Sequence, residues 1–223
     1  MIGIDHAYPA GQDRSKMLQC VPVYDEALKK CGRSTGVLVR YADDFVVLCP
    51  TEQRANEARA RAAETLSPIG LRLHPEKTRI AHLAGGSEGF DFLGFHLRMR
   101  RSKKRPGRYS MQMWPSDRAM ASIKAKVRDR TPRAYVGRDL HYVVEDLNPV
   151  LRGWGAYFRY GNSNLKFNVI DRYVHERLAK LASVKHGLSG RNWTTRYTYG
   201  WLSDIGIYRL TGTVRYWSAN ASR

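Results

Sequence analysis

The sequence predicts an α+β fold, in which a small layer of strands and helix is followed by a mostly α-helical, basic domain. Up to about residue 115, apolar and β-branched residues form short runs that are typical of strands. From Ser116 onward, apolar residues recur at three- and four-residue spacing, as in amphipathic helices. We therefore expect three segments: residues 1–34, irregular with a short helix at 23–31; residues 35–115, rich in strands; and residues 116–223, helical.

Charge divides the chain in a similar way. Residues 1–97 carry 12 basic and 12 acidic residues, whereas residues 98–223 carry 26 and 8 and hold the whole net charge of +18. A neutral half joined to a strongly basic half indicates a polyanionic partner, and nucleic acid is the leading candidate.

Composition excludes several classes of protein. The 223 residues suffice for one large or two small domains with a core. The sequence contains no run of 18 apolar residues, so we expect no membrane span. Cys20, Cys31 and Cys49 lack the spacing of a disulfide framework or a cysteine zinc site. We therefore expect a reducing, cytoplasmic location.

Two adjacent aspartates interrupt the first apolar stretch. Asp43 and Asp44 lie between the runs at residues 37–39 and 45–48, which predicts two strands joined by a tight turn. Carboxylates at such a tip can ligate Mg²⁺, and two such ions can clamp the oxygens of a phosphoryl transfer. The alternative is ordinary turn chemistry, in which Asp is common.

The next elements are predicted from caps and periodicity. Thr51 is a suitable N-cap for a helix that ends near Pro68 and Gly70. Its apolar positions are Ala55, Ala58, Ala62, Leu66 and Ile69. Residues 90–97 are expected to form one strand, and residues 1–22 are expected to be irregular.

A basic stretch follows this strand. Pro106-Gly107 marks a turn within it, so residues 98–114 read as a hairpin with a charged tip. A solvated loop that protects a sheet edge is the alternative, but seven cations without a carboxylate favour phosphate contact. The cations are Arg98, Arg100, Arg101, Lys103, Lys104, Arg105 and Arg108.

Three helices are expected in the basic half. Ser116 caps the first, and an apolar stripe at residues 140–147 forms the next element. Asn148-Pro149 then predicts the start of a new helix that ends at Gly161. A third helix is expected from Ser163 to about Gly187. The aromatic residues of the tail fit either core packing or base stacking.

In order along the chain, three segments resemble the last three palm blocks of bacterial group II intron reverse transcriptases: VRYADDF (residues 39–45), GLRLHPEKT (70–78) and FLGF (92–95). A fourth segment, LNPVLRGWGAYF (147–158), is similar to the start of their maturase-specific, thumb-like domain. The resemblance covers roughly residues 35–223. It implies a partial reverse-transcriptase palm at 35–115 and a thumb/maturase domain at 116–223.

The resemblance implies an RNA-directed DNA polymerase that uses Mg²⁺. Asp43 would be the principal metal ligand with Asp44 beside it, and Tyr41 would lie near the primer end or the incoming nucleotide. Lys77 would lie near the triphosphate as a proton donor, or it is a surface lysine in a turn. Phe92, Leu93 and Gly94 would form the primer grip, although a β-bulge would also explain the glycine.

The implied partners are group II intron RNA and an RNA template with a DNA primer. The residues expected to bind RNA are all basic: Arg98, Arg100, Arg101, Lys103, Lys104, Arg105, Arg108, Lys124, Arg128 and Arg152.

The chain departs from the family pattern upstream of Tyr41. Only 40 residues precede it, whereas the family's fingers and a palm strand with a third metal-binding carboxylate lie well before this block. We therefore expect a truncated palm that is inactive as a polymerase alone, unless a separate chain carries the fingers. The alternatives are a non-catalytic RNA-binding splicing factor and a non-functional remnant of a mobile element.

Overall fold

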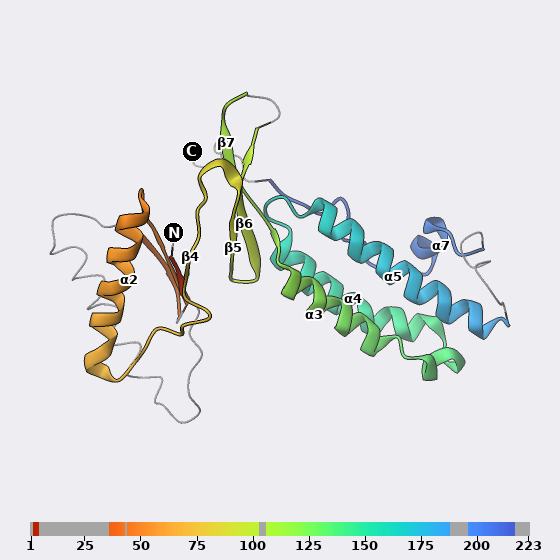
Figure 1. The fold of residues 1–223 in the computed structure, drawn as a ribbon. Helices are drawn as coiled ribbons and strands as arrows, with labels where there is room; N and C mark the ends of the chain where they lie inside the picture. The colour runs from red at the N-terminus through yellow and green to blue at the C-terminus, as the bar shows by residue number, and fades with distance from the viewer. Residues whose placement is uncertain (1, 5–35, 43, 103–105, 188–195, 217–223) are drawn as a thin grey trace, which may run out of the picture. The chain divides into compact units, whose positions relative to one another are not determined.

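The computed structural model describes residues 2–4, 36–42, 44–102, 106–187 and 196–216 (Figure 1). The chain divides into two compact units. One comprises Met1–Leu93 and Leu97–Met111, and the other comprises Gly94–His96 and Gln112–Arg223. The mixed order of strands and helices confirms the predicted α+β class. The short helix expected at residues 23–31 lies outside the described residues.

A four-stranded sheet forms the centre of the first unit. Its strands are β1 (Ile2–Ile4), β2 (Val37–Tyr41), β3 (Asp44–Leu48) and β4 (Arg79–Ile80), in the order β2-β3-β1-β4. The predicted hairpin is confirmed, because β2 and β3 are antiparallel and Tyr41 pairs with Asp44. Strand β1 is a difference from the sequence prediction, which has residues 1–22 irregular. A three-residue strand is too short to show a period of its own, and pairing on both sides defines it.

Helix α2 (Glu52–Leu66) covers one face of this sheet (Figure 1). The Thr51 hydroxyl accepts a hydrogen bond from the Arg54 amide at 3.3 Å, as expected of the predicted N-cap. Small alanines let the helix approach the strands closely. The buried cluster beneath it comprises Phe45, Val47, Ala55, Ala58 and Ala62. Ile69, expected on this apolar face, lies beyond the helix in the 3₁₀ turn η1 (Ser67–Ile69) and is exposed.

The opposite face of β3 is also buried in part. Val46 forms a second cluster with Ala81 and Phe90, against which Leu83, Phe92 and Leu97 pack. Successive residues of a strand point to opposite faces, so Phe45 and Val47 contact α2 while Val46 faces this second cluster. Strand β3 is therefore anchored from both sides.

The predicted strand at residues 90–97 is wrong in one respect, because two strands occupy this region. They are β5 (Gly89–Phe92) and β6 (Phe95–Arg101), and with β7 (Tyr109–Pro115) they form a three-stranded sheet in the order β5-β6-β7. Leu93 and Gly94 separate β5 from β6 with φ values of 50° and 76°. Two consecutive positive φ values make a tight hairpin turn of the primed type. The residue pattern alternates on both sides of Leu93 and Gly94, so it did not reveal that the chain reverses direction there. The reversal depends on these two backbone angles.

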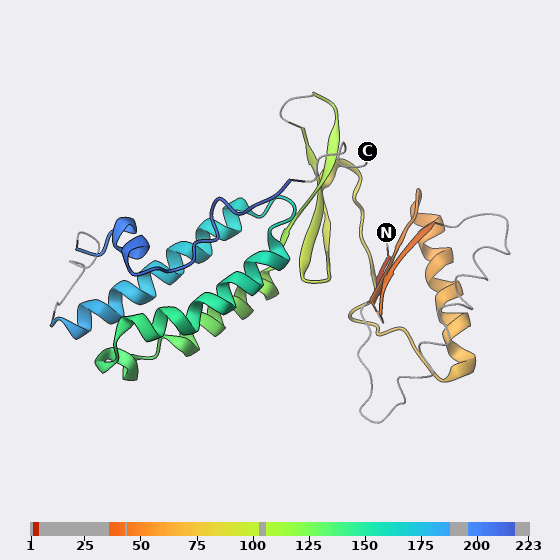
Figure 2. The ribbon, with the colours of Figure 1, turned by 180° about the vertical axis from the view of Figure 1, so that it is seen from behind.

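The second unit is built on three long helices: α3 (Asp117–Arg130), α4 (Leu140–Phe158) and α5 (Asn164–Lys185) (Figure 2). The Ser116 hydroxyl caps α3 by accepting from the Ala119 amide at 3.2 Å. The predicted inward positions of α3 and α5 are confirmed as one buried core that includes Ile123, Val127, Phe167, Ile170 and Leu178. An ion pair of 2.9 Å links Lys166 on α5 to Asp117 on α3.

Helix α4 corrects the prediction that a new helix starts at Asn148-Pro149. The helix runs without a break through both residues, and Pro149 lies on its exposed side. The Asn148 side chain donates to the Gly206 carbonyl at 3.0 Å and accepts from the Tyr208 amide at 2.7 Å. A residue typical of a helix start is therefore used here to hold a distant segment.

The segment after α5 contains a short helix, α7 (Tyr199–Asp204), and is tied to the bundle by buried polar groups. The Asp171 carboxylate accepts from the amides of Leu210 and Thr211, at 2.9 and 2.8 Å. His175 donates from Nε2 to the carbonyl of Tyr197. With Asn148, these groups give the C-terminal segment a defined path along α4 and α5.

Candidate active site and nucleic-acid interface

The paired aspartates lie at the turn of the β2–β3 hairpin. Asp44 is the first residue of β3 and is half-buried, while Asp43 lies outside the described residues. Because Phe45 faces α2, the alternation of the strand directs Asp44 to the opposite sheet face. Tyr41, which pairs with Asp44, is 66% exposed. The hairpin thus presents a carboxylate and an aromatic ring together on one face.

Backbone strain accompanies this turn. Ala42 has a φ of 52°, in the left-handed region that costs a non-glycine residue about 1 kcal/mol. Leu93, at the β5–β6 turn, has a φ of 50°. Primed turns favour Asn or Gly at such positions, so neither residue is the conformationally preferred choice.

Lys77 lies at the same edge of the sheet as Asp44. Strand β1 is antiparallel to both β3 and β4, so β3 and β4 run in the same direction and start at one edge. Asp44 begins β3, and Lys77 is exposed in the turn that precedes β4. Two strand spacings separate β3 from β4, which is about 10 Å. A ligand at this edge that spans that distance can reach both side chains.

Phe92, Leu93 and Gly94 form the end of the β5–β6 hairpin. Phe92 packs against the cluster around Val46, within the first unit. Gly94 approaches Phe158 so closely that an added Cβ would lie 3.3 Å from its Cζ atom. Gly94 is thus part of a turn, which replaces the β-bulge considered as the alternative.

The basic hairpin residues differ in their surroundings. The Arg98 guanidinium donates to the carbonyls of Gly86 and Ser87, at 2.9 and 3.1 Å, and is therefore engaged within the protein. Arg101 and Arg108 are exposed next to the hairpin closure. Arg100 is also exposed and makes contacts within the protein. The predicted tip residues Lys103, Lys104 and Arg105 lie outside the described residues.

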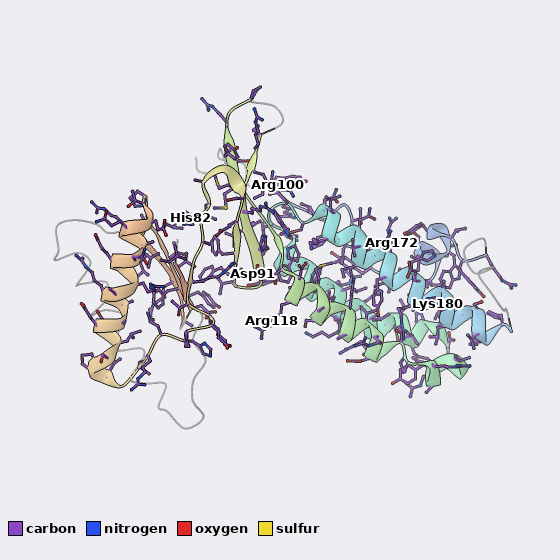
Figure 3. All side chains as sticks on the ribbon, in the orientation of Figure 1. His82, Asp91, Arg100, Arg118, Arg172 and Lys180 are labelled. Carbon is purple, nitrogen blue, oxygen red and sulfur yellow. The ribbon has the colours of Figure 1, made fainter. Side chains whose placement is uncertain are left out.

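The predicted RNA-binding cations on the helices also differ in their surroundings. Arg128 is exposed on α3, whereas Lys124 is half-buried with its Nζ atom 5.8 Å from the ring centroid of Tyr173. Arg152 is exposed on α4, and its guanidinium lies 4.7 Å from the ring centroid of Tyr208. Figure 3 shows more basic side chains on the same bundle, with Arg118 on α3 and Arg172 and Lys180 on α5.

Comparison with protein families identifies two domains in the chain. The model of the reverse transcriptase (RNA-dependent DNA polymerase) family matches residues 19–97. The model of the group II intron, maturase-specific domain matches residues 120–200. The chain belongs to the group II intron reverse transcriptase/maturase family. A search among curated proteins gave no match.

One carboxylate of this reverse transcriptase/maturase lies at the β2–β3 turn among the described residues. Carboxylate oxygens are the ligands that Mg²⁺ prefers, and Asp44 places one at the hairpin. Within the described part of the chain, no group of three or more His, Cys, Asp or Glu residues has the arrangement of a metal site. No helix in that part is long and apolar enough to cross a membrane.

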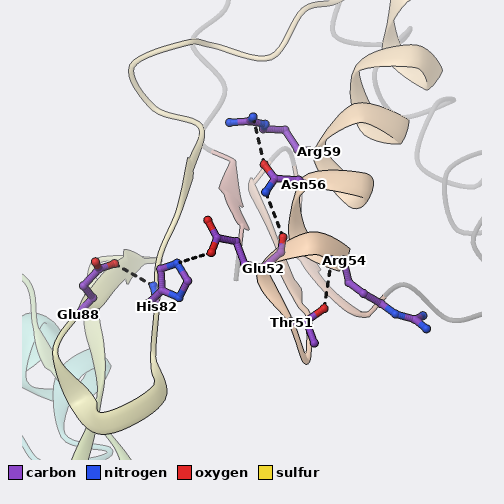
Figure 4. Close-up of polar contacts among 7 residues, drawn as sticks. All are labelled: Thr51, Glu52, Arg54, Asn56, Arg59, His82 and Glu88. Atoms are coloured by element: carbon purple, nitrogen blue, oxygen red, sulfur yellow. Dashed lines mark hydrogen bonds and ion pairs between the residues drawn. The ribbon is translucent and has the colours of Figure 1, made fainter.

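One polar cluster of the reverse transcriptase/maturase was not predicted from the sequence (Figure 4). His82 Nε2 lies 3.5 Å from the Glu52 carboxylate, and the His82 amide donates to Glu88 at 2.8 Å. These contacts connect the start of α2 with the segment that leads to β5. All three residues are exposed. No short motif links positions so far apart, so only their proximity in the fold identifies the cluster.

Proposed function

We propose that this chain binds group II intron RNA and a template–primer, and that its hairpin turns contact the primer end and the metal. Family membership supports RNA as the partner. The basic balance of residues 98–223 supports phosphate contacts, because cations that neutralise phosphates release counterions and so drive association.

The observation that carries this proposal is the location of backbone strain. Among the described residues, Ala42 and Leu93 are the only non-glycine residues with positive φ. One lies in the Y-A-D-D block and the other in the F-L-G block. Strained residues persist only where their surroundings hold them, and they concentrate at functional sites. Two such residues in two family motifs favour functional turns over ordinary connections.

Asp43 and Asp44 would hold the magnesium ions. When bound, the metal neutralises charge that develops on the transferring phosphoryl group. Lys77, exposed at the same sheet edge as Asp44, would donate a proton or bind negative charge near the triphosphate. Tyr41 offers an exposed ring for contact with the primer end or the nucleotide.

We further propose that this polypeptide alone does not extend a primer, because two of the family's three metal-binding carboxylates are assigned in it. A further carboxylate from outside these 223 residues would complete the site. The test is primer extension on poly(rA)/oligo(dT) with Mg²⁺. We expect no product above background, and robust extension by the 223-residue chain would refute this part of the proposal.

A non-catalytic RNA-binding splicing factor is the second candidate, favoured by the matched maturase-specific domain. In this case the double variant Asp43→Ala/Asp44→Ala keeps its affinity for intron RNA. Arg101→Ala/Arg108→Ala instead lowers affinity and reduces the salt slope by about 0.7–0.9 per lost phosphate contact. Equal loss of affinity in the aspartate variant would contradict this function. We also propose that the RNA is bound in the cytoplasm. The spacing of the three cysteines does not fit a disulfide framework, and cytoplasmic cysteines stay reduced.

A further inference from the structure

A pocket of about 230 Å³ lies within the second unit, and its wall residues fall between Tyr135 and Trp201. Its walls come from the 3₁₀ turn η3 (Arg133–Gly137), the start of α4 and the end of α5. Tyr197 and Trp201 complete them. Pockets that bind drug-sized ligands measure about 300–1,000 Å³, so this smaller pocket suits one small ring system.

Aromatic rings and a guanidinium plane line the pocket. The Arg138 guanidinium lies 3.9 Å from the ring centroid of Tyr135, in a stacked cation–π contact. The rings of Tyr197 and Trp201 have centroids 4.7 Å apart. The Tyr197 hydroxyl is buried without a hydrogen-bond partner among the described residues. Unstacked RNA bases are recognised by such surfaces, which combine aromatic faces, arginine planes and polar groups.

Two cationic side chains belong to the same walls. Arg138 and Lys185 line the pocket and are exposed. Lys185 Nζ donates to the Arg138 carbonyl at 3.1 Å, which holds the two cationic residues together. The one acidic wall residue, Asp139, caps α4 by accepting from the His141 amide at 3.0 Å. Its charge is therefore directed toward the helix N-terminus, where it is favourable.

We propose that this pocket takes one unstacked base of an RNA strand, with the adjoining phosphate on Arg138 and Lys185. The proposal rests on the RNA-binding function proposed above and adds a specific contact to it. The aromatic walls would stack on the base. Arg138 and Lys185 would bind the phosphate, because the only carboxylate of the walls, Asp139, is already engaged as the cap of α4. A free mononucleotide has the same chemistry, so the test must separate these two sources.

The experiment uses the full chain and a short single-stranded RNA that carries one 2-aminopurine, whose fluorescence is quenched by stacking. Fluorescence anisotropy of an end label reports total RNA binding in the same titration. Two substitutions address the pocket. Lys185→Ala removes a wall cation, and Ala182→Leu places an isobutyl group in the pocket without changing charge. Lys180→Ala is the matched control, because it removes one exposed cation from α5 outside the pocket.

We expect quenching in the wild type, and a midpoint at least about 5-fold higher in Lys185→Ala and Ala182→Leu than in Lys180→Ala. Stacking contributes about 1–3 kcal/mol per base, which corresponds to about 5- to 140-fold in affinity. Unchanged thermal unfolding of Ala182→Leu shows that the loss is local. If Ala182→Leu does not fold, the comparison of Lys185→Ala with Lys180→Ala decides the outcome.

Two results would overturn the pocket while leaving RNA binding intact: no quenching with normal anisotropy, or equal quenching in all variants. Adenosine 5′-monophosphate is added as a competitor. If it abolishes quenching at a concentration equal to that of the RNA, the pocket binds a free nucleotide instead, and the proposal is also overturned. Absence of any anisotropy change would refute the broader RNA-binding function, and the pocket proposal with it.

Discussion

Two glycines of α4, Gly153 and Gly155, differ in how closely other side chains pack against them. Replacing each with alanine measures the effect of this packing on stability. A Cβ added at Gly153 would meet no atom within 4 Å, whereas one at Gly155 would lie 2.5 Å from Leu210 Cδ2. Gly153 is exposed and Gly155 is buried, and both lie in the same helix. Gly153→Ala and Gly155→Ala therefore share the gain in helix propensity and differ only in steric cost.

The magnitudes follow from this geometry. Alanine is about 0.8–1 kcal/mol more favourable than glycine in a helix interior, so Gly153→Ala should raise the free energy of unfolding by about that amount. Gly155→Ala has the same gain, but Leu210 is fully buried and must shift. Overpacking of this kind costs about 1–3 kcal/mol. The two variants should thus differ by about 1–3 kcal/mol, with Gly155→Ala the less stable.

Urea unfolding followed by far-ultraviolet circular dichroism measures both variants, because α3, α4 and α5 supply much of the helical signal. Protection of the Leu210 amide from hydrogen exchange shows whether the C-terminal segment stays in place. Equal free energies of unfolding, or greater stability for Gly155→Ala, would show that Leu210 does not pack against the helix as described.

Further predictions concern charge and backbone strain. Asp171→Ala leaves two amides without their acceptor, and at about 1–3 kcal/mol for each unsatisfied group it should destabilise the helical unit by at least about 2 kcal/mol in urea unfolding. A loss below about 0.5 kcal/mol would contradict those hydrogen bonds. The hydrogen bond from Lys166 holds the pKa of Asp117 below its ordinary value of 3.8. The ion pair should therefore stabilise the fold above pH 3.8 and lose this effect as the pH falls through the lowered pKa. Because Asp117 is 97% exposed, the effect should be only a few tenths of a kcal/mol and should disappear in high salt; comparison with Lys166→Ala from pH 7 to pH 2 checks both the sign and the size. Leu93→Asn should stabilise the β5–β6 turn by about 1 kcal/mol, since Asn tolerates positive φ, while weakening primer binding; stronger binding would count against the proposed grip.

Local signals in the sequence predicted much of the fold. Residues only a few positions apart predicted the Thr51 and Ser116 caps and the hairpin around Asp44. They also predicted the inward faces of α2, α3 and α5. The order of the motifs also predicted the family that the comparisons identify. The roles assigned to Lys77 and to the basic side chains remain predictions.

The elements that the sequence predicted wrongly depend on tertiary contacts. Asn148 has the local chemistry of an N-cap, but its side chain satisfies Gly206 and Tyr208, which are 58 and 60 residues away. β1 is defined by its pairing with β3 and β4. A helix cap or a hydrophobic period depends on residues close together in the sequence. A polar side chain in the folded protein can instead bond to a distant segment that the fold brings next to it. The sequence by itself thus determined the elements and the family, and the tertiary structure determined which polar groups hold the C-terminal segment and which walls form the pocket.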